Sequence, residues 1–145
     1  MVERIGDILF VHGGIGPQVA AYPLSLPVVN QLACQSLDTL AKGAVGSAQW
    51  AVGSSNPSSP SWYRGMAQEE LRIAQVNQMI KQYGVKQIII GHTPVEEITV
   101  LSNQHVIAID LAHQQHIEQG FMKALLIEDG QFYRYATDGT KQRFL

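Results

Sequence analysis

Cysteine and charge are both scarce in this chain of 145 residues. Its one cysteine, Cys34, excludes a framework of internal disulfides, and we expect it to pack as a small hydrophobic residue on the apolar side of a helix. Charged residues make up 15% of the chain and the formal net charge is −2. Electrostatics therefore favour neither nucleic acid nor an anionic membrane as a partner.

Long apolar runs are also absent. The run at residues 85–90 is far too short to span a bilayer, and residues 1–10 contain charges that do not fit a signal peptide. We therefore expect a cytoplasmic protein. Hydrophobic residues make up 46% of the chain, which is typical of a globular domain with a sizeable core. Its length predicts that residues 1–145 form a single domain.

The spacing of apolar residues predicts an α/β fold, a mixed β-sheet with flanking helices. In the first two thirds we expect a strand at 8–11, a helix between Ser25 and Gly43, a loop at 53–61, a helix at 69–83 ended by Gly84, and a strand at 87–90.

The last third predicts an antiparallel meander with hairpin turns at 102–104 and 128–130. Its expected strands lie at 97–101, 105–109, 124–127 and 132–135. Only seven residues precede the strand 8–11, as in a chain that begins in mid-fold, and the loss of half a fold would leave this strand without a neighbour on one side. Such an unpaired edge favours association with another chain.

Two histidines each follow a predicted strand and lie beside glycine. Residues 9–17 read LFVHGGIGP and residues 88–94 read IIIGHTP, which places His12 and His92 at strand ends. Open α/β sheets bind their ligands at the carboxyl ends of strands, and neutral imidazole binds divalent transition metals. A catalytic metal needs about three protein ligands. Asp110, after the strand 105–109, is the best further candidate, and the alternative is that each histidine has only a structural role.

Residues 62–65, which read WYRG, close a loop rich in proline and serine. The planar guanidinium of Arg64 is suited to bidentate contact with phosphate. The alternative is a loop whose aromatic side chains pack on the core while Arg64 is solvated. A second polar cluster contains Asp110, His113, His116 and Glu118. No helical or strand face is evident there, so we interpret it as a polar loop, with His113 as a weaker candidate ligand.

In this order, the three motifs around His12, Arg64 and His92 resemble those of the calcineurin-like metallophosphoesterases. Within that family the chain is most similar to the phosphoprotein phosphatase type, as in the bacterial Shewanella-like protein phosphatases. The resemblance implies half of a four-layer α-β-β-α sandwich that hydrolyses phosphomonoesters of a phosphorylated protein or a small molecule.

The resemblance also implies two divalent metal ions (Mn, Fe or Zn) in the complete enzyme. By that likeness His12 and His92 would ligate the second metal, and Arg64 would grip the substrate phosphate, with Tyr63 beside it. Two metals activate a bridging water and an arginine neutralises the transferred phosphoryl group.

The family's earlier motifs, Gly-Asp-x-His-Gly, Gly-Asp-x-x-Asp-Arg-Gly and Gly-Asn-His-Glu, are absent from these 145 residues. Those motifs carry the ligands of the first metal, the bridging aspartate and the general-acid histidine. The resemblance therefore implies the C-terminal portion of a metallophosphoesterase domain, which alone holds at most one partly liganded metal and is inactive. Its expected partner is the missing N-terminal half or a second copy.

Two other classes of protein compete with this interpretation. His-Gly-Gly after a strand is similar to the oxyanion loop of α/β-hydrolase esterases, but the chain lacks the nucleophile elbow Gly-x-Ser-x-Gly. The stronger alternative is a non-catalytic module that binds phosphate or a metal on a phosphatase-like sheet.

Overall fold

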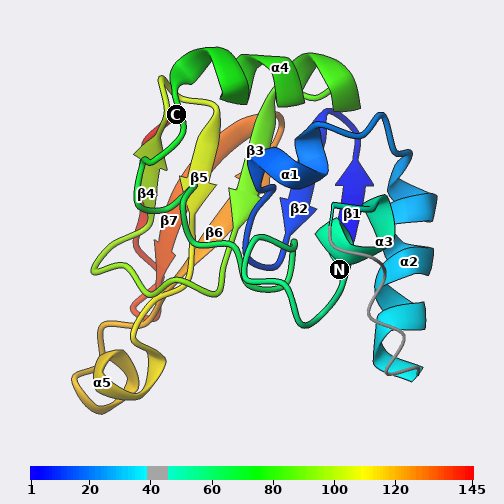
Figure 1. Ribbon diagram of the computed structural model, residues 1–145. Coiled ribbons are helices and arrows are strands. Elements are labelled where there is room, and N and C mark those ends of the chain that lie inside the picture. The colour runs from blue at the N-terminus through cyan, green and yellow to red at the C-terminus, as the bar shows by residue number, and fades with distance from the viewer. Residues whose placement is uncertain (39–45) are drawn as a thin grey trace.

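The computed structural model describes residues 1–38 and 46–145 (Figure 1). Five strands form the main sheet, in the order β1-β2-β3-β5-β4. They are β1 (Val2–Ile5), β2 (Ile8–Val11), β3 (Gln87–Ile90), β4 (Thr99–Leu101) and β5 (Val106–Ala108). The three central strands β2, β3 and β5 are parallel, while β1 and β4 are antiparallel to their neighbours. The mixed sheet predicted from the sequence is confirmed.

A second sheet of three antiparallel strands lies behind the first (Figure 1). Its strands are β6 (Lys123–Glu128), β7 (Gln131–Ala136) and β8 (Lys141–Arg143). The helices are α1 (Pro17–Ala20), α2 (Leu26–Asp38), α3 (Ala48–Val52), α4 (Ile73–Tyr83) and α5 (His113–Glu118). No helix in residues 1–38 and 46–145 has the length and hydropathy needed to cross a membrane.

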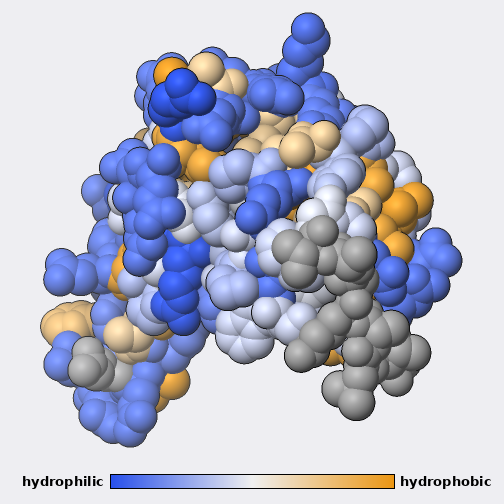
Figure 2. Space-filling model, in the orientation of Figure 1, coloured by the Kyte–Doolittle hydropathy of each residue, from blue (hydrophilic) through white to orange (hydrophobic). Residues whose placement is uncertain are grey.

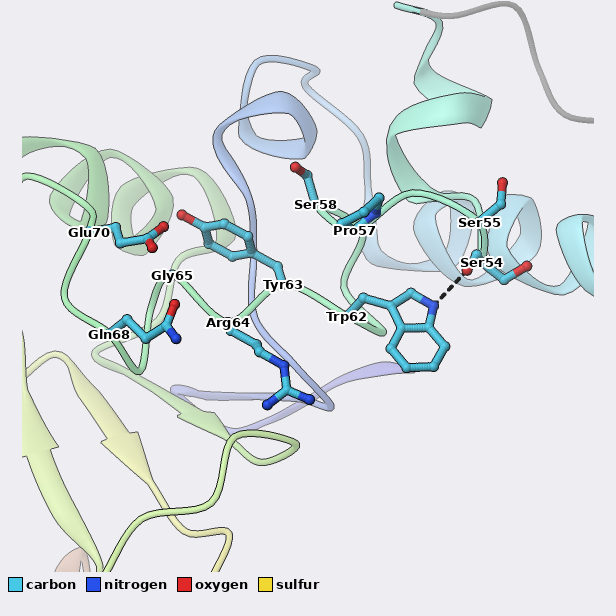
Figure 3. A pocket seen from close by; sticks show the side chains of 10 residues that line it. All are labelled: Ser54, Ser55, Pro57, Ser58, Trp62, Tyr63, Arg64, Gly65, Gln68 and Glu70. Atoms are coloured by element: carbon cyan, nitrogen blue, oxygen red, sulfur yellow. Dashed lines mark hydrogen bonds between the residues drawn. The ribbon is translucent and has the colours of Figure 1, made fainter.

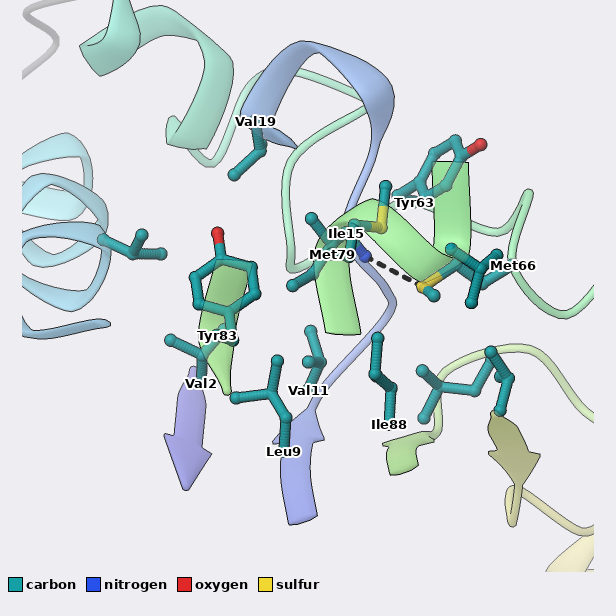
Figure 4. Close-up of a cluster of buried hydrophobic side chains, with 14 of the residues drawn as sticks. Val2, Leu9, Val11, Ile15, Val19, Tyr63, Met66, Met79, Tyr83 and Ile88 are labelled. Atoms are coloured by element: carbon teal, nitrogen blue, oxygen red, sulfur yellow. Dashed lines mark hydrogen bonds between the residues drawn. The ribbon is translucent and has the colours of Figure 1, made fainter. Parts of the chain in front are cut away.

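Side chains of the central strands alternate between two apolar clusters because successive residues of a strand point to opposite faces. On the helical side, Leu9 and Ile88 pack against Met79 of α4 and the buried loop residue Met66 (Figure 4). On the other side, Ile89 packs in a smaller cluster with Phe132 of β7. The flanking helices and the small sheet thus cover opposite faces of the main sheet.

The expectation of an unpaired edge at β2 is wrong. Strand β1 pairs with β2 along its whole length, from Val2 opposite Val11 to Ile5 opposite Ile8. Sequence periodicity missed β1 because only Val2 of its four residues is buried. The sheet edge lies at β1, where the side-chain amide of Asn30 donates to the carbonyl of Val2 at 2.8 Å and accepts from its N–H at 3.0 Å.

The predicted meander is also wrong in one respect, because its strands divide between two sheets. The hairpin β4–β5 belongs to the main sheet, where β5 is parallel to β3, and the hairpin β6–β7 belongs to the small sheet. Both hairpin turns are present, and Ser102, Asn103, Gln104 and Asp129 all have positive φ.

The helices differ from the prediction in their ends. Helix α4 begins at Ile73, four residues later than expected, and ends as predicted at Gly84, which has φ 62°. The predicted end of α2 at Gly43 lies outside the described residues. Cys34 is exposed on α2, so its expected packing as a small hydrophobic residue is wrong.

Candidate active site at the carboxyl ends of the parallel strands

The candidate site lies where the parallel strands of the main sheet end. His12 directly follows β2, and His92 follows β3 after one glycine. The loops after the two strands are joined because the N–H of Gly91 donates to the carbonyl of His12 at 2.9 Å. The two imidazole rings lie with their centroids 5.0 Å apart. The structure thus brings together the two histidines that the sequence predicts as metal ligands.

His92 is held in an unfavourable backbone conformation, with φ 63°. Non-glycine residues rarely adopt positive φ, and such strain gathers at functional sites. Its Nε2 is buried and has no hydrogen-bond partner in the described part of the chain. Because buried polar atoms are almost always paired, this nitrogen is a strong candidate for binding a ligand or a metal ion.

Three neighbouring influences lower the pKa of His92 below its ordinary value. Burial is the largest, followed by the positive charges of Arg64 and His12, while the carboxylate of Asp110 acts in the opposite direction. The lowered pKa keeps the imidazole neutral, and neutral imidazole is the form that ligates metals.

Gly13 allows the loop that carries Arg64 to approach the end of β2. Its N–H donates to the carbonyl of Pro60 at 2.7 Å. A Cβ at position 13 would lie 3.1 Å from that carbonyl oxygen and equally close to the main-chain N and O of Tyr63. Only glycine fits without displacing this loop.

Arg64 is exposed, and its guanidinium forms no hydrogen bond or ion pair among residues 1–38 and 46–145. Tyr63, in contrast, is 9% exposed and belongs to the core cluster on the helical side. Burial, and to a smaller extent the charge of Glu70, raises the pKa of the Tyr63 hydroxyl. Figure 3 shows the Tyr63 and Arg64 side chains pointing in different directions, so that only Arg64 extends toward the strand ends.

An open cavity of about 580 Å³ adjoins this loop (Figure 3). Its lining consists of Ser54, Ser55, Pro57, Ser58, Trp62, Tyr63, Arg64, Gly65, Gln68 and Glu70. Trp62 also contacts His92, with ring centroids 5.3 Å apart in an edge-to-face arrangement. Trp62 is not among the site residues predicted from the sequence. Its position two residues before Arg64, in the motif at 62–65, is the signal that could reveal it.

Asp110 and His113 lie at the margin of the site. Asp110 follows β5, and its Oδ1 lies 3.6 Å from Nε2 of His113. The side chain of His113 is 60% exposed. Residues 113–118 form helix α5, so the interpretation of this segment as a polar loop is wrong. In the part of the chain that the structure describes, no three His, Cys, Asp or Glu side chains gather closely enough to hold a metal ion together.

No protein-family model and no curated protein matches the chain. Among solved structures, the chain is similar to a cold-active protein-tyrosine phosphatase of a psychrophilic Shewanella species, with 27% sequence identity and a TM-score of 0.83. A second structure of a cold-active protein tyrosine phosphatase gives 26% identity and a TM-score of 0.79.

The match to the first structure covers 100% of this chain and 43% of the phosphatase chain. The second covers 99% of this chain and 41% of its counterpart. The chain therefore spans about two fifths of the length of these phosphatases and has a phosphatase-like fold.

Proposed function

We propose that this chain takes part in the metal-dependent hydrolysis of phosphomonoesters, as a portion of a calcineurin-like metallophosphoesterase. In this proposal His12 and His92 hold one divalent ion, either Mn, Fe or Zn, and Arg64 binds the substrate phosphate. The observation that carries the proposal is the buried, unpartnered Nε2 of His92, whose ring lies 5.0 Å from that of His12.

The two histidines fit a metal in chemistry and in position. Both rings stand on rigid strand ends, and the lowered pKa of His92 keeps its imidazole neutral. When bound, a divalent ion lowers the pKa of a water ligand and polarises a phosphoryl oxygen. The histidines themselves fix the direction from which their nitrogens approach, since Gly91 ties the two loops together.

Arg64 supplies the positive charge that a phosphate requires. Its side chain is exposed next to His92 and has no other partner in the described residues. A planar guanidinium forms two parallel hydrogen bonds to phosphate oxygens and stabilises the charge that develops on the transferred group. The close fit of Gly13 under the loop 60–64 keeps this guanidinium at the strand ends.

Two histidines are fewer ligands than a catalytic metal normally needs. Asp110 is a carboxylate whose charge acts on His92, and the carboxylate motifs of the family are absent from the 145 residues. We therefore propose that the remaining ligands come from a further polypeptide segment, either an N-terminal half or a second copy. The greater length of the similar phosphatases supports the first source. The 145 residues alone would then be inactive.

The proposed substrate is a phosphorylated protein, since the similar solved structures are protein-tyrosine phosphatases. The alternative is a non-catalytic module that binds phosphate or a metal. The lack of a cluster of three ligands in residues 1–38 and 46–145 favours this alternative for the chain taken by itself.

Calorimetric titration with Mn²⁺ and Zn²⁺ tests the metal site. We expect His12→Ala and His92→Ala each to weaken binding by about 10-fold or more, because each removes a direct ligand. His105→Ala is the control, because His105 lies at the opposite end of the sheet, with its Nδ1 3.1 Å from the carbonyl of Lys86. Equal metal affinity in all three variants would overturn the site.

Hydrolysis of para-nitrophenyl phosphate tests the rest of the proposal. The 145 residues with Mn²⁺ should give negligible turnover, and robust turnover would contradict the incomplete site. Arg64→Ala should weaken the binding of inorganic phosphate while leaving metal affinity unchanged. If metal and phosphate both bind but no added segment restores turnover, the non-catalytic alternative holds.

A further inference from the structure

Trp62 is a large aromatic side chain that stands partly in solvent beside the proposed phosphate site. Its side chain is 49% exposed, although it lies on a loop that is otherwise packed closely against the end of β2. Exposed tryptophan is unusual unless it serves a contact, because burial of an indole ring is strongly favourable. The exposed part of the ring therefore needs an explanation that core packing does not give.

The indole ring is held in place from two sides. Its Nε1–H donates to the carbonyl of Ser54 at 2.6 Å, which ties the ring to the neighbouring loop. Its other restraint is the edge-to-face contact with His92, at an interplanar angle of 78°. A ring that is already ordered loses little further freedom when a ligand packs against it.

Trp62 and Arg64 flank the same histidine. Trp62 contacts the His92 ring, and Arg64 lies two residues further along the same loop. Figure 3 shows the two side chains extending from one loop toward the same side. A phosphate held by Arg64 would thus have its ester oxygen, and the first carbon beyond it, close to the indole.

We propose that Trp62 binds the aromatic ring of an aryl phosphate and makes the site prefer phenolic phosphates, such as phosphotyrosine, over phosphates of alkyl alcohols. An aryl ring stacks on an indole or packs edge-to-face with it, whereas a short alkyl group offers little contact area. The cavity of about 580 Å³ beyond Trp62, lined by Ser54 and Pro57, has room for a tyrosine side chain. This inference rests on the proposed function, since Arg64 must hold the phosphate.

Binding of three non-hydrolysable ligands tests the preference, with Zn²⁺ present throughout. The ligands are inorganic phosphate, methylphosphonate and phenylphosphonate, and the quantity of interest is the affinity ratio of the last two. We expect the unaltered chain to bind phenylphosphonate about 5-fold more tightly than methylphosphonate, the range that an aromatic pair provides.

The variants Trp62→Leu and Trp62→Phe separate the aromatic contact from apolar bulk. The ratio should fall to near unity in Trp62→Leu and persist in part in Trp62→Phe. Tyr135→Leu is the matched control, because Tyr135 is an aromatic residue of β7 with similar exposure, 43%. It should leave the ratio unchanged.

The outcomes distinguish the two proposals. If all three ligands bind through Arg64 but Trp62→Leu leaves the ratio unchanged, the role of Trp62 is overturned and the proposed function stands.

If inorganic phosphate fails to bind, the proposed function fails, and the binding of phenol then tests the aromatic surface of Trp62 alone. A shift of the Trp62 indole N–H signal in nuclear magnetic resonance on addition of phenol would support the aromatic surface, and the lack of a shift would overturn it.

Discussion

At the amino ends of β2 and β3, Asp7 and Lys86 form an ion pair with a separation of 2.8 Å, and the main chain of Lys86 donates to the carbonyl of Asp7. Arg4 lies beside them and donates to the carbonyls of Gly6 and Tyr83. At the carboxyl ends of the same strands, the N–H of Gly91 donates to the carbonyl of His12, but two buried side-chain atoms are unpaired in the described residues. Nε2 of His92 and Oγ1 of Thr93 are buried without hydrogen bonds.

This difference supports the proposal that the carboxyl end of the sheet is its functional end. An unpaired buried polar group costs free energy, so a fold retains one where something other than the fold uses it. The same strands carry an ion pair at one end and unpaired buried side-chain atoms at the other. We therefore expect a ligand to bind at the carboxyl end, where it would compensate for these unpaired atoms.

The largest expected effect comes from filling the space under the Arg64 loop. Gly13→Val would place side-chain atoms against the carbonyl of Pro60 and the main chain of Tyr63, and we expect it to lower the free energy of unfolding by about 3 kcal/mol. It should also abolish phosphate binding by displacing Arg64. Chemical denaturation and phosphate titration measure the two effects.

Gly6→Ala is the matched change at the amino end. A Cβ at Gly6 meets no atom within 4 Å, but the residue has φ 61°, so strain alone should cost about 1 kcal/mol. Phosphate affinity should stay unchanged. Equal loss of phosphate affinity in both variants would break the distinction between the two ends.

A smaller effect, of opposite sign, is expected from His92→Gly. The change relieves the positive φ and removes the buried, unpartnered Nε2, so the free energy of unfolding should rise by about 0.5–1 kcal/mol while metal binding is lost. Thermal denaturation without added metal measures this gain. His105→Gly, which removes a paired histidine at the amino end, should instead destabilise the chain. A loss of stability in His92→Gly equal to that in His105→Gly would contradict the idea of a strained site.

The smallest effect is the pH dependence contributed by the ion pair at the amino end. The hydrogen bond from Lys86 lowers the pKa of Asp7, and the same bond raises the pKa of Lys86. The contribution of Asp7 is fully present above the ordinary aspartate pKa of about 3.9 and is lost as the pH falls through its lower folded value. That of Lys86 is fully present below the ordinary lysine pKa of about 10.4 and is lost as the pH rises through its higher folded value.

Asp7→Asn should accordingly lower the denaturation midpoint slightly at pH 7 and leave it unchanged near pH 2. The effect should shrink in high salt because both groups are exposed. Glu3→Gln is the control, as Glu3 is an exposed carboxylate of β1 with no ion pair in the described part of the chain. A larger dependence on pH in Glu3→Gln than in Asp7→Asn would rule out the ion pair as its source.

The parallel strands of the site were predictable because they are uninterrupted apolar runs. Residues 8–11 and 87–90 are buried on both faces of the sheet, so their composition alone predicts buried strands. Strand β1 could not be found in this way, since all of its residues except Val2 are exposed. The turns of both late hairpins were also predictable, but a turn fixes only local pairing and does not determine which sheet a hairpin joins.

The candidate site was predictable to the extent that its residues follow strands. His12 and His92 meet because β2 and β3 are parallel neighbours, which their sequence patterns favour. Trp62 contacts His92 across thirty residues of sequence, through a loop whose path depends on the fit between Gly13 and Pro60. No local pattern encodes such a contact. Helix α5 was missed for a related reason, since its six residues are mostly polar.

Asn30 bears on how this sheet could grow. Its amide occupies both main-chain groups of Val2 that point away from β2, as the backbone of an added strand would do. Along an edge strand, every second residue directs its main-chain N–H and C=O away from the paired neighbour. Arg4 is therefore the next residue of β1 whose main-chain groups point away from β2. A strand that docks at this edge must either displace Asn30 or begin its pairing at Arg4. Helix α2, which carries Asn30, thus covers the end of the β1 edge where an added strand would otherwise pair with Val2.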